Sequence, residues 1–103
     1  MDRSDIICLL TPTSLKTPQG VTVTTYEERV VFCRVRSISR SEFYDAGRNG
    51  LNPDFEFIVF AGDYNGERLV RYKGNTYAIY RTYYGKNDNL ELYVQREGGV
   101  NGK

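Results

Sequence analysis

Alternating apolar and polar positions run through most of the chain and predict short β-strands. The strongest pair is residues 67–73 and 76–84, which Gly74-Asn75 joins with the residue types of a tight two-residue turn. In the second strand the alternation places Tyr77, Ile79, Arg81 and Tyr83 on one face, and Thr76, Ala78, Tyr80, Thr82 and Tyr84 on the other. Because aromatics occupy both faces, the strand needs cover on both sides. The pattern therefore predicts either a closed, tyrosine-rich core or a surface that an assembly partner covers.

Five further segments carry strand-like patterns, at residues 6–10, 21–26, 29–38, 54–59 and 90–95. The first is a continuous apolar run, which predicts a strand buried on both faces. In the third, one face carries Val31, Cys33 and Val35 and reads as core, while the other carries Val30, Phe32, Arg34 and Arg36. A face that mixes apolar bulk with arginine is typical of a partner contact, although arginine stems also cover apolar neighbours in monomers.

Turn signals separate these strands. Residues 11–20 hold two prolines and a glycine among Thr and Ser, which predicts a loop. Residues 63–66 end in Asn-Gly and predict a reversal, so that the strand at 54–59 and the central hairpin would form a meander. Residues 86–89 predict another reversal. The tail at 98–103 is expected to be frayed.

A single short helix is expected between the strands at 29–38 and 54–59. Ser39 and Glu42 have the spacing of a capping box, in which each side chain accepts a hydrogen bond from the other residue's amide. The helix runs from about Arg40 to Gly47, and Gly47 or Gly50 ends it.

The fold class that follows is mainly β: a small antiparallel β-barrel of about six strands with one short helix. A chain of 103 residues suits a single domain, here residues 1–97, followed by the flexible tail 98–103. No segment is long and apolar enough to span a bilayer, and no secretory leader is evident, so synthesis in a reducing cytosol and no membrane partner are expected.

Composition argues against catalysis and metal binding. The chain has no histidine, the commonest general base and metal ligand, so we expect a non-enzymatic protein without cofactor or metal. Glu27-Glu28 could form an acid/base or metal site, but a solvated turn is favoured because no other ligands converge on it. Cys8 and Cys33 lie in apolar runs and are interpreted as core residues, since two ligands are too few for zinc and a disulfide has no support.

The formal net charge is +1, with 14 basic and 13 acidic residues, and gives no overall attraction to nucleic acid. Arg34, Arg36 and Arg40 lie near Phe32 and Phe43 in sequence, which fits a single-strand nucleic-acid surface of the kind that small barrels carry. Acidic residues lie close by and predict a balanced patch. An alternative function therefore stays open, in which the chain is a small β-barrel binding module for nucleic acid or peptide.

Taken in order, the segments between 30 and 97 resemble the head-closure proteins of long-tailed bacteriophages, also called stopper or head-tail adaptor proteins. The resemblance covers about two-thirds of the chain and rests on order and spacing more than on any one motif. Its pieces are a strand ending at 35–39, a helix at 40–46, an extended strand to Phe60, Asp63-Tyr64-Asn65-Gly66-Glu67, the set Val70, Tyr72, Gly74 and Tyr77, Ile79-Tyr80-Arg81-Thr82, and Leu90-Glu91-Leu92-Tyr93.

The resemblance implies a structural virion component, made in the bacterial host cytoplasm and located at the head-tail interface. Proteins similar to this one form a ring below the portal and its adaptor, retain packaged DNA, and present a docking surface for the tail. The implied partners are further copies of the chain, the portal or adaptor protein, and a tail-completion or tail tube protein, with DNA only passing nearby. Isolated subunits can be monomers.

Two sets of residues are candidates for these contacts. The channel-facing element of the family corresponds to residues 39–54, which makes Arg40, Glu42, Phe43, Tyr44 and Arg48 candidates for the lumen or for contacts between subunits. A ring subunit must also bury two flanks against identical neighbours. From their mixed faces, the candidate flank residues are Val30, Phe32, Ile58, Phe60, Tyr80 and Tyr93, because aromatics are enriched at interfaces.

Overall fold

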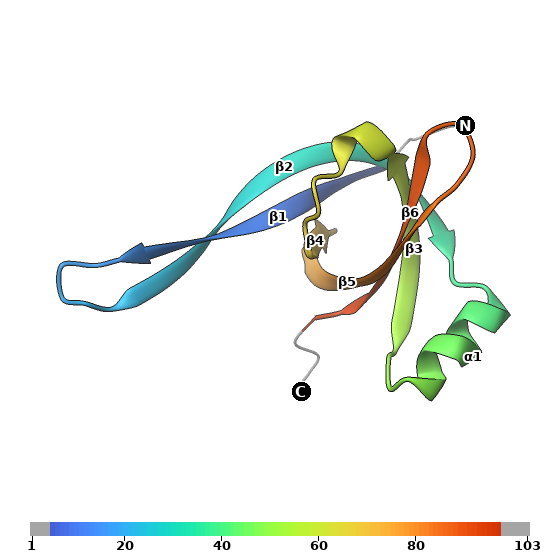
Figure 1. The fold of residues 1–103 in the computed structure, drawn as a ribbon, viewed down its shortest axis with the longest axis horizontal. Coiled ribbons are helices and arrows are strands. Elements are labelled where there is room, and N and C mark those ends of the chain that lie inside the picture. Colours follow the sequence, from blue (N-terminus) through green and yellow to red (C-terminus); the bar gives the residue numbers. More distant parts are fainter. Residues whose placement is uncertain (1–4, 98–103) are drawn as a thin grey trace.

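The computed structural model describes residues 5–97, and in that range six antiparallel strands form one closed, barrel-like sheet with a single α-helix (Figure 1). This confirms the predicted mainly β fold with six strands and one short helix. The expected frayed tail lies outside the described residues. The elements are β1 (Asp5–Lys16), β2 (Thr22–Ser37), α1 (Arg40–Arg48), β3 (Pro53–Phe60), the 3-10 turn η1 (Ala61–Asp63), β4 (Leu69–Tyr72), β5 (Asn75–Tyr84) and β6 (Asn89–Arg96).

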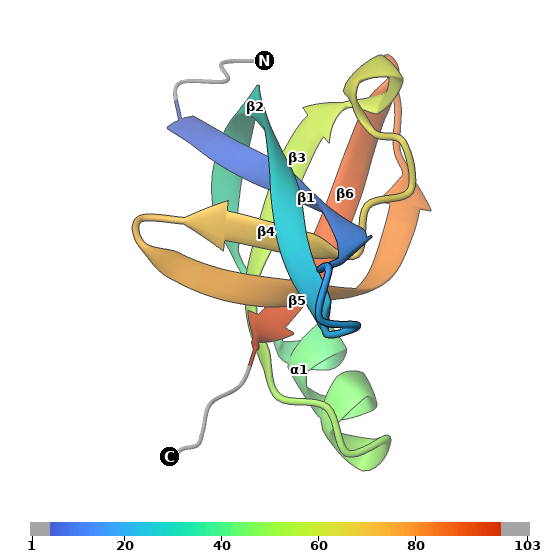
Figure 2. The same ribbon diagram turned by 90° about the vertical axis from the view of Figure 1, so that its left-hand side faces the viewer.

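The strand order around the sheet is β1-β2-β3-β6-β5-β4, and β4 closes the ring by pairing with β1. The meander predicted for β3 and the central hairpin is wrong, because β3 pairs with β2 and β6 while β4 pairs with β1 and β5. The chain between them, η1 and the loop to Arg68, crosses the end of the barrel instead of reversing in place (Figure 2). The Asn65-Gly66 signal marks a real bend, with Gly66 at φ +84°, inside a longer connection.

The interior is a single apolar cluster to which all six described strands contribute. Phe57 lies at its centre and makes edge-on ring contacts with Tyr72 at 5.1 Å and Tyr77 at 6.2 Å. Tyr72 and Tyr77 are themselves buried. The tyrosine-rich core, one of the two predictions for the central hairpin, is therefore present on the inner face. Edge-to-face ring contacts stabilise it beyond the burial of apolar area.

Strands β1 and β2 continue far beyond the barrel as a two-stranded arm, defined as residues 11–27, which gives the molecule a long axis of 49 Å (Figure 1). The loop predicted at residues 11–20 is therefore wrong over most of its length: pairing continues to Lys16↔Thr22, and the turn occupies 17–20. Pro12 is tolerated because this part of β1 is an edge strand. The predicted strand at 21–26 is confirmed from Thr22 onward.

The central hairpin turn lies one residue earlier than predicted. Tyr72 pairs with Asn75, so Lys73 and Gly74 are the central residues, with φ of +50° and +81°. Two positive φ values favour the type I′ turn that matches strand twist. The predicted faces of β5 also fail beyond Ile79, because a register shift at Tyr80 turns Arg81 to the outer side of the sheet opposite Tyr93.

Helix α1 lies below one end of the barrel (Figure 2). Ser39 Oγ accepts the Glu42 amide at 3.2 Å, which confirms the N-cap, but the Glu42 carboxylate faces β5 instead of returning to Ser39. At the other end, Gly50 adopts φ +77° and its amide donates to the Gly47 carbonyl at 3.1 Å, while the Leu51 amide donates to the Ala46 carbonyl at 3.0 Å. These two bonds form a Schellman motif, as Gly50 predicts.

One burial expectation needs correction. Ile6 was expected in a strand buried on both faces, but its side chain is 53% exposed, because only the odd-numbered positions of β1 face the core before Leu10. The core face predicted for β2 is correct, since Val31 and Cys33 are buried. Burial raises the pKa of the Cys33 thiol to about 12, and both cysteines are free thiols.

Candidate interaction surface

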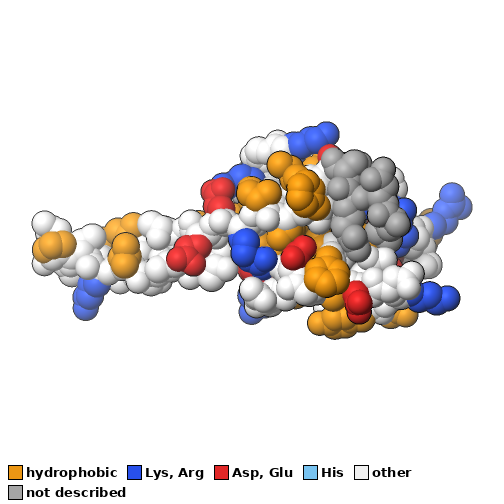
Figure 3. Space-filling view, turned by 90° about the horizontal axis from the view of Figure 1, so that it is seen from above, with side chains coloured by type: hydrophobic (Ala, Val, Ile, Leu, Met, Phe, Trp, Pro, Cys, Tyr) orange, Lys and Arg blue, Asp and Glu red, His pale blue; other side chains and the backbone are white. Residues whose placement is uncertain are grey.

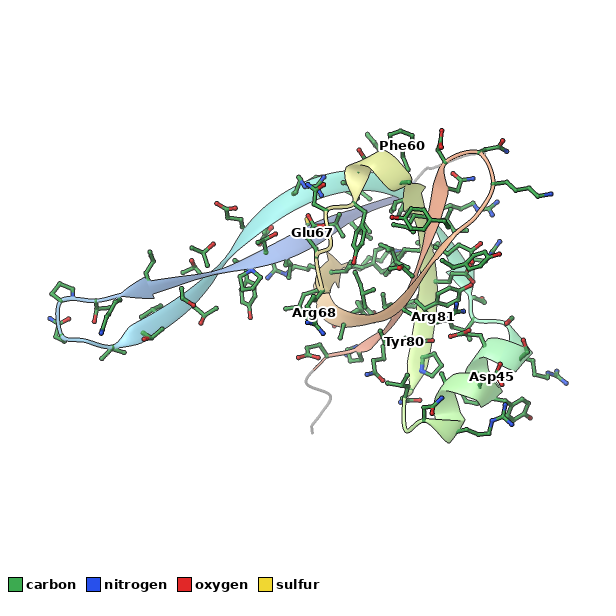
Figure 4. All side chains as sticks on the ribbon, viewed as in Figure 1. Asp45, Phe60, Glu67, Arg68, Tyr80 and Arg81 are labelled. Atoms are coloured by element: carbon green, nitrogen blue, oxygen red, sulfur yellow. The ribbon has the colours of Figure 1, made fainter. Side chains whose placement is uncertain are left out.

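A row of apolar side chains crosses the outer face of β1, β2 and β3 at the top of the barrel; we call it the apolar patch. Ile6 is paired with Phe32, and the Cys33↔Val59 register puts Phe60 beside Phe32 on the next strand. Val30 follows on the same face of β2. Phe32 is 64% exposed and Val30 61%. Figure 3 shows hydrophobic side chains gathered over this face, and Figure 4 labels Phe60 at its edge.

The apolar patch arises because outer positions of three adjacent strands carry apolar residues where an isolated barrel would carry polar ones. The Phe60 ring also lies against Gly62, where an added Cβ would meet the ring at 2.5 Å. Large exposed apolar groups that are adjacent mark contact surfaces more often than scattered ones do. No described segment of the chain covers them.

On the outer face of β2, β3 and β6, arginine and carboxylate side chains alternate across the strands. Arg36 forms an ion pair with Glu56, which is 3% exposed, and lies 3.5 Å from Glu91. Tyr93 donates to Glu91 at 2.5 Å. Burial, opposed by Arg36, raises the pKa of Glu56, and burial together with the Glu91 carboxylate raises the pKa of the Tyr93 hydroxyl. Of the three arginines considered for nucleic acid, Arg36 is therefore already paired within the subunit.

The same network continues to the helix. Glu42 accepts hydrogen bonds from Tyr80 at 2.8 Å and from Arg81 at 2.5 Å. The Arg81 guanidinium lies 4.0 Å from the centre of the Tyr93 ring. Burial and the Glu42 hydrogen bond both raise the pKa of Tyr80. Since Ala46 is the buried residue of α1, the Glu42 contacts are its main polar attachment to the barrel.

An open cleft of about 390 Å³ lies between α1 and β5. Figure 4 shows Asp45 of the helix facing Tyr80 and Arg81 across it. Its charged walls are engaged with one another through Glu42 and Arg81. The geometry therefore fixes the helix to the barrel.

A second cleft, about 690 Å³, lies where the arm leaves the barrel. Glu67, 8% exposed, accepts from Arg29 at 2.6 Å and from the Asn65 amide at 2.8 Å. Burial would raise the pKa of Glu67, but the bonds from Arg29 and Asn65 outweigh it and hold the pKa below its ordinary value. Glu28 pairs with Arg71 close by. These contacts join the arm base to β4 and to the loop before it (Figure 4).

The predicted channel residues are distributed around α1. Arg40, Phe43, Tyr44 and Arg48 are exposed, and the Phe43 and Tyr44 rings contact each other at 6.1 Å. Glu42 differs, because it faces the barrel. The exposed four project from the helix end of the molecule and are available to a lumen or a neighbour.

The predicted flank residues divide into two groups. Val30, Phe32 and Phe60 are exposed and belong to the apolar patch. Ile58 and Tyr93 are 2% and 8% exposed, so the expectation of an exposed flank is wrong at these two positions. Arg34 and Arg36 and their acidic neighbours fill the outer face around them. Tyr80 is half-buried against Glu42.

Sequence reasoning missed the residues that organise the outer face, namely Glu56, Glu67, Glu91 and Arg81. The sequence did contain one signal: Glu56 is a carboxylate in the interior of a strand pattern. A buried carboxylate requires a partner of opposite charge. The Glu27-Glu28 pair lies in β2 at the arm base, not in a turn. Within residues 5–97 no three potential ligand side chains converge as a metal site. In the same part of the chain, α1 is too short and too polar to cross a bilayer.

Comparison with known proteins yields one structural neighbour to report. The solution structure of protein SF1141 from Shigella flexneri 2a superposes with a TM-score of 0.72 at 15% sequence identity, over 93% of this chain and 94% of that chain. At this identity the likeness shows a shared fold. No protein-family model matches the sequence, and no curated protein matches it.

Proposed function

We propose that this protein is a head-tail connector component of a bacteriophage or prophage, of the head-closure type. Copies would assemble as a ring below the portal and adaptor, retain packaged DNA, and present a surface to the tail. The order and spacing of segments from residue 30 to 97 carry the resemblance, and a small closed β-sheet with a helix after its second strand agrees with it.

The observation that carries the proposal is the apolar patch on a subunit in which Arg29, Arg36 and Arg81 are each paired with a carboxylate. Ile6, Val30 and Phe32 would remain in water in a solitary subunit. A neighbouring copy or virion protein that covers them gains roughly 25 cal/mol for each Å² of apolar surface removed from water. In a closed ring every copy buries such a flank, because the interface between copies is heterologous.

Charge balance also suits a ring that encloses DNA. A lumen that neutralised phosphates would hold the DNA in a salt-dependent way and slow its release. Here Arg36, Arg81 and Arg29 are each paired with a carboxylate. These pairs favour assembly over the alternative of a nucleic-acid binding module.

The test is deletion of the gene from the phage that encodes it, followed by electron microscopy of the particles. We expect DNA-filled heads that lose their DNA and lack tails. Complementation with Phe32→Ser should fail, whereas Tyr84→Ser, which changes an exposed aromatic outside the apolar patch, should restore tailed particles. Normal tailed virions from the deletion strain would refute the proposal.

A further inference from the structure

The arm has two free edges. β1 pairs with β4 only at residues 8–10, so its segment 11–16 has β2 on one side and no described strand on the other. β2 pairs with β3 only from Cys33 onward, so its segment 22–32, apart from Phe32 beside Phe60 at its end, has β1 on one side and no described strand on the other. Each free edge presents backbone amide and carbonyl groups that a further strand can pair with.

The longer edge lacks three of the common protections against strand addition, namely lysine, proline and a bulge, and its charged residues are confined to positions 27–29. Residues 22–32 contain neither proline nor glycine nor lysine and are rich in Val, Thr, Tyr and Phe, which favour strands. Natural edges are commonly blocked with lysine, proline or a bulge, and regular pairing with β1 shows no bulge here. Pro12 and Lys16 lie on the opposite edge. An open edge of this length is a template with which another strand can pair.

The arm also lacks support on its faces. Leu15, Val21, Val23 and Tyr26 are each between 41% and 57% exposed. A two-stranded ribbon alone is at best marginally stable in water, and three or more strands with a covered face are needed for independent stability. Added strands would supply both the missing pairing and the missing cover.

We propose that the arm joins copies of this protein by edge-to-edge strand addition, with segment 11–16 of one copy pairing against segment 22–32 of the next. The two free edges lie on opposite sides of one antiparallel ribbon, so side-by-side arms continue the same up-and-down alternation. Each interface pairs one free edge of β1 with one free edge of β2, and in a closed ring every free edge of both types is paired. The choice of a second copy as occupant rests on the proposed ring function.

Charge favours contact between a β1 edge and a β2 edge over contact between two β2 edges. Lys16 is the charged residue of segment 11–16, and the β2 edge carries Glu27 and Glu28. Glu28 and Arg29 are held by Arg71 and Glu67 of the same subunit, so the Glu27 carboxylate leaves the β2 edge with a negative charge and the edge of segment 11–16 carries a positive one. Two β2 edges would bring their glutamates together instead, and like charges across strands are unfavourable.

Cysteine cross-linking between separately labelled chains tests the arrangement. In a Cys8→Ser background, one chain carries Ser14→Cys and the other carries Thr24→Cys, Tyr26→Cys or Val30→Cys, positions that share the face of Ser14 and so allow for different registers. Equal mixtures are treated with a short bismaleimide, both as concentrated purified protein and in assembled phage particles. We expect covalent dimers in at least one mixture and none from any single variant alone.

Two outcomes overturn the inference: dimers formed by the β2-edge variants on their own, or no dimer in either preparation. A third chain, in which residues 13–25 are replaced by Asn-Gly between Pro12 and Tyr26, should keep the thermal transition of the barrel and run as a monomer at the concentration at which the full-length chains cross-link, because the core lies outside the arm. Absence of the protein from the particles would refute the proposed function alone, since the purified protein still decides the arm contact.

Discussion

The attachment of α1 through Glu42 permits a quantitative prediction for Glu42→Ala. A nine-residue helix is too short to be stable by itself, and Ala46 is its buried residue. The substitution removes the bonds from Tyr80 and Arg81 but leaves the Ser39 cap, which uses the backbone amide of residue 42. The helix should therefore open locally while the barrel stays folded.

The magnitude follows from the two bonds. The bond from half-buried Tyr80 to a carboxylate is worth about 1.5 to 2 kcal/mol. The Arg81 side chain is 43% exposed, so solvent screening reduces that ion pair to about 0.5 to 1 kcal/mol. Together they favour the closed helix by about 2 to 3 kcal/mol, which corresponds to roughly a 30- to 140-fold change in the opening equilibrium.

Native-state hydrogen exchange measures this directly. Amides in the last turns of α1 should exchange faster by that factor, while those of Phe57 and Leu92 keep their wild-type rates. Arg48→Ala is the matched control, because it breaks the exposed pair with Asp45 and should change exchange by about twofold at most. Unchanged exchange in α1, or equal acceleration in Phe57 and Leu92, would show that Glu42 does not hold the helix.

Three further predictions concern single side chains. Glu67→Gln should lower the free energy of unfolding by about 1.5 to 3 kcal/mol at pH 7. Because the pKa of Glu67 is depressed in the folded state, the stability advantage of the wild type is full above the ordinary pKa of 4.5 and disappears as the pH falls through the folded-state pKa. Urea titrations of both proteins at pH 7 and pH 3 would reveal this difference. Phe32→Ser should leave the thermal midpoint within about 2 °C, since the ring is 64% exposed, and a larger drop measured by circular dichroism would contradict the placement of the ring outside the core. Cys33 should not react with a thiol reagent in the folded protein, whereas half-buried Cys8 should react slowly and both should react in denaturant.

Local signals predicted the pieces of this fold well. Period-two alternation located the core positions of β2 and β6, and the Ser39 cap with Gly50 bounded the helix. These features depend on neighbours within a few residues, which a sequence displays directly. The helix cap was nevertheless incomplete as a prediction, because Glu42 gains more from Tyr80 and Arg81 than from the Ser39 amide.

Long-range pairing explains the failures. Nothing between residues 54 and 72 says that β4 belongs beside β1, a choice made by closure of the sheet. The proline-containing segment 11–16 forms a strand because residues 22–27 pair with it across the arm. The burial of Ile58 and Tyr93 likewise depends on arginines and carboxylates contributed by other strands. The types of residue that form the candidate surface could therefore be predicted from the sequence. Which of these residues are exposed and which are buried could not.

Among the described strands β6 comes last in chain order, and it occupies a place between β3 and β5. Until it is synthesised, both neighbours have an unpaired side, and the cylinder cannot close. The nascent chain must therefore hold an open sheet until β6 has been synthesised, and unpaired strands are prone to aggregate in that interval. A premature stop codon shortly before Asn89 should thus be far more harmful than loss of a similar length of chain from the arm.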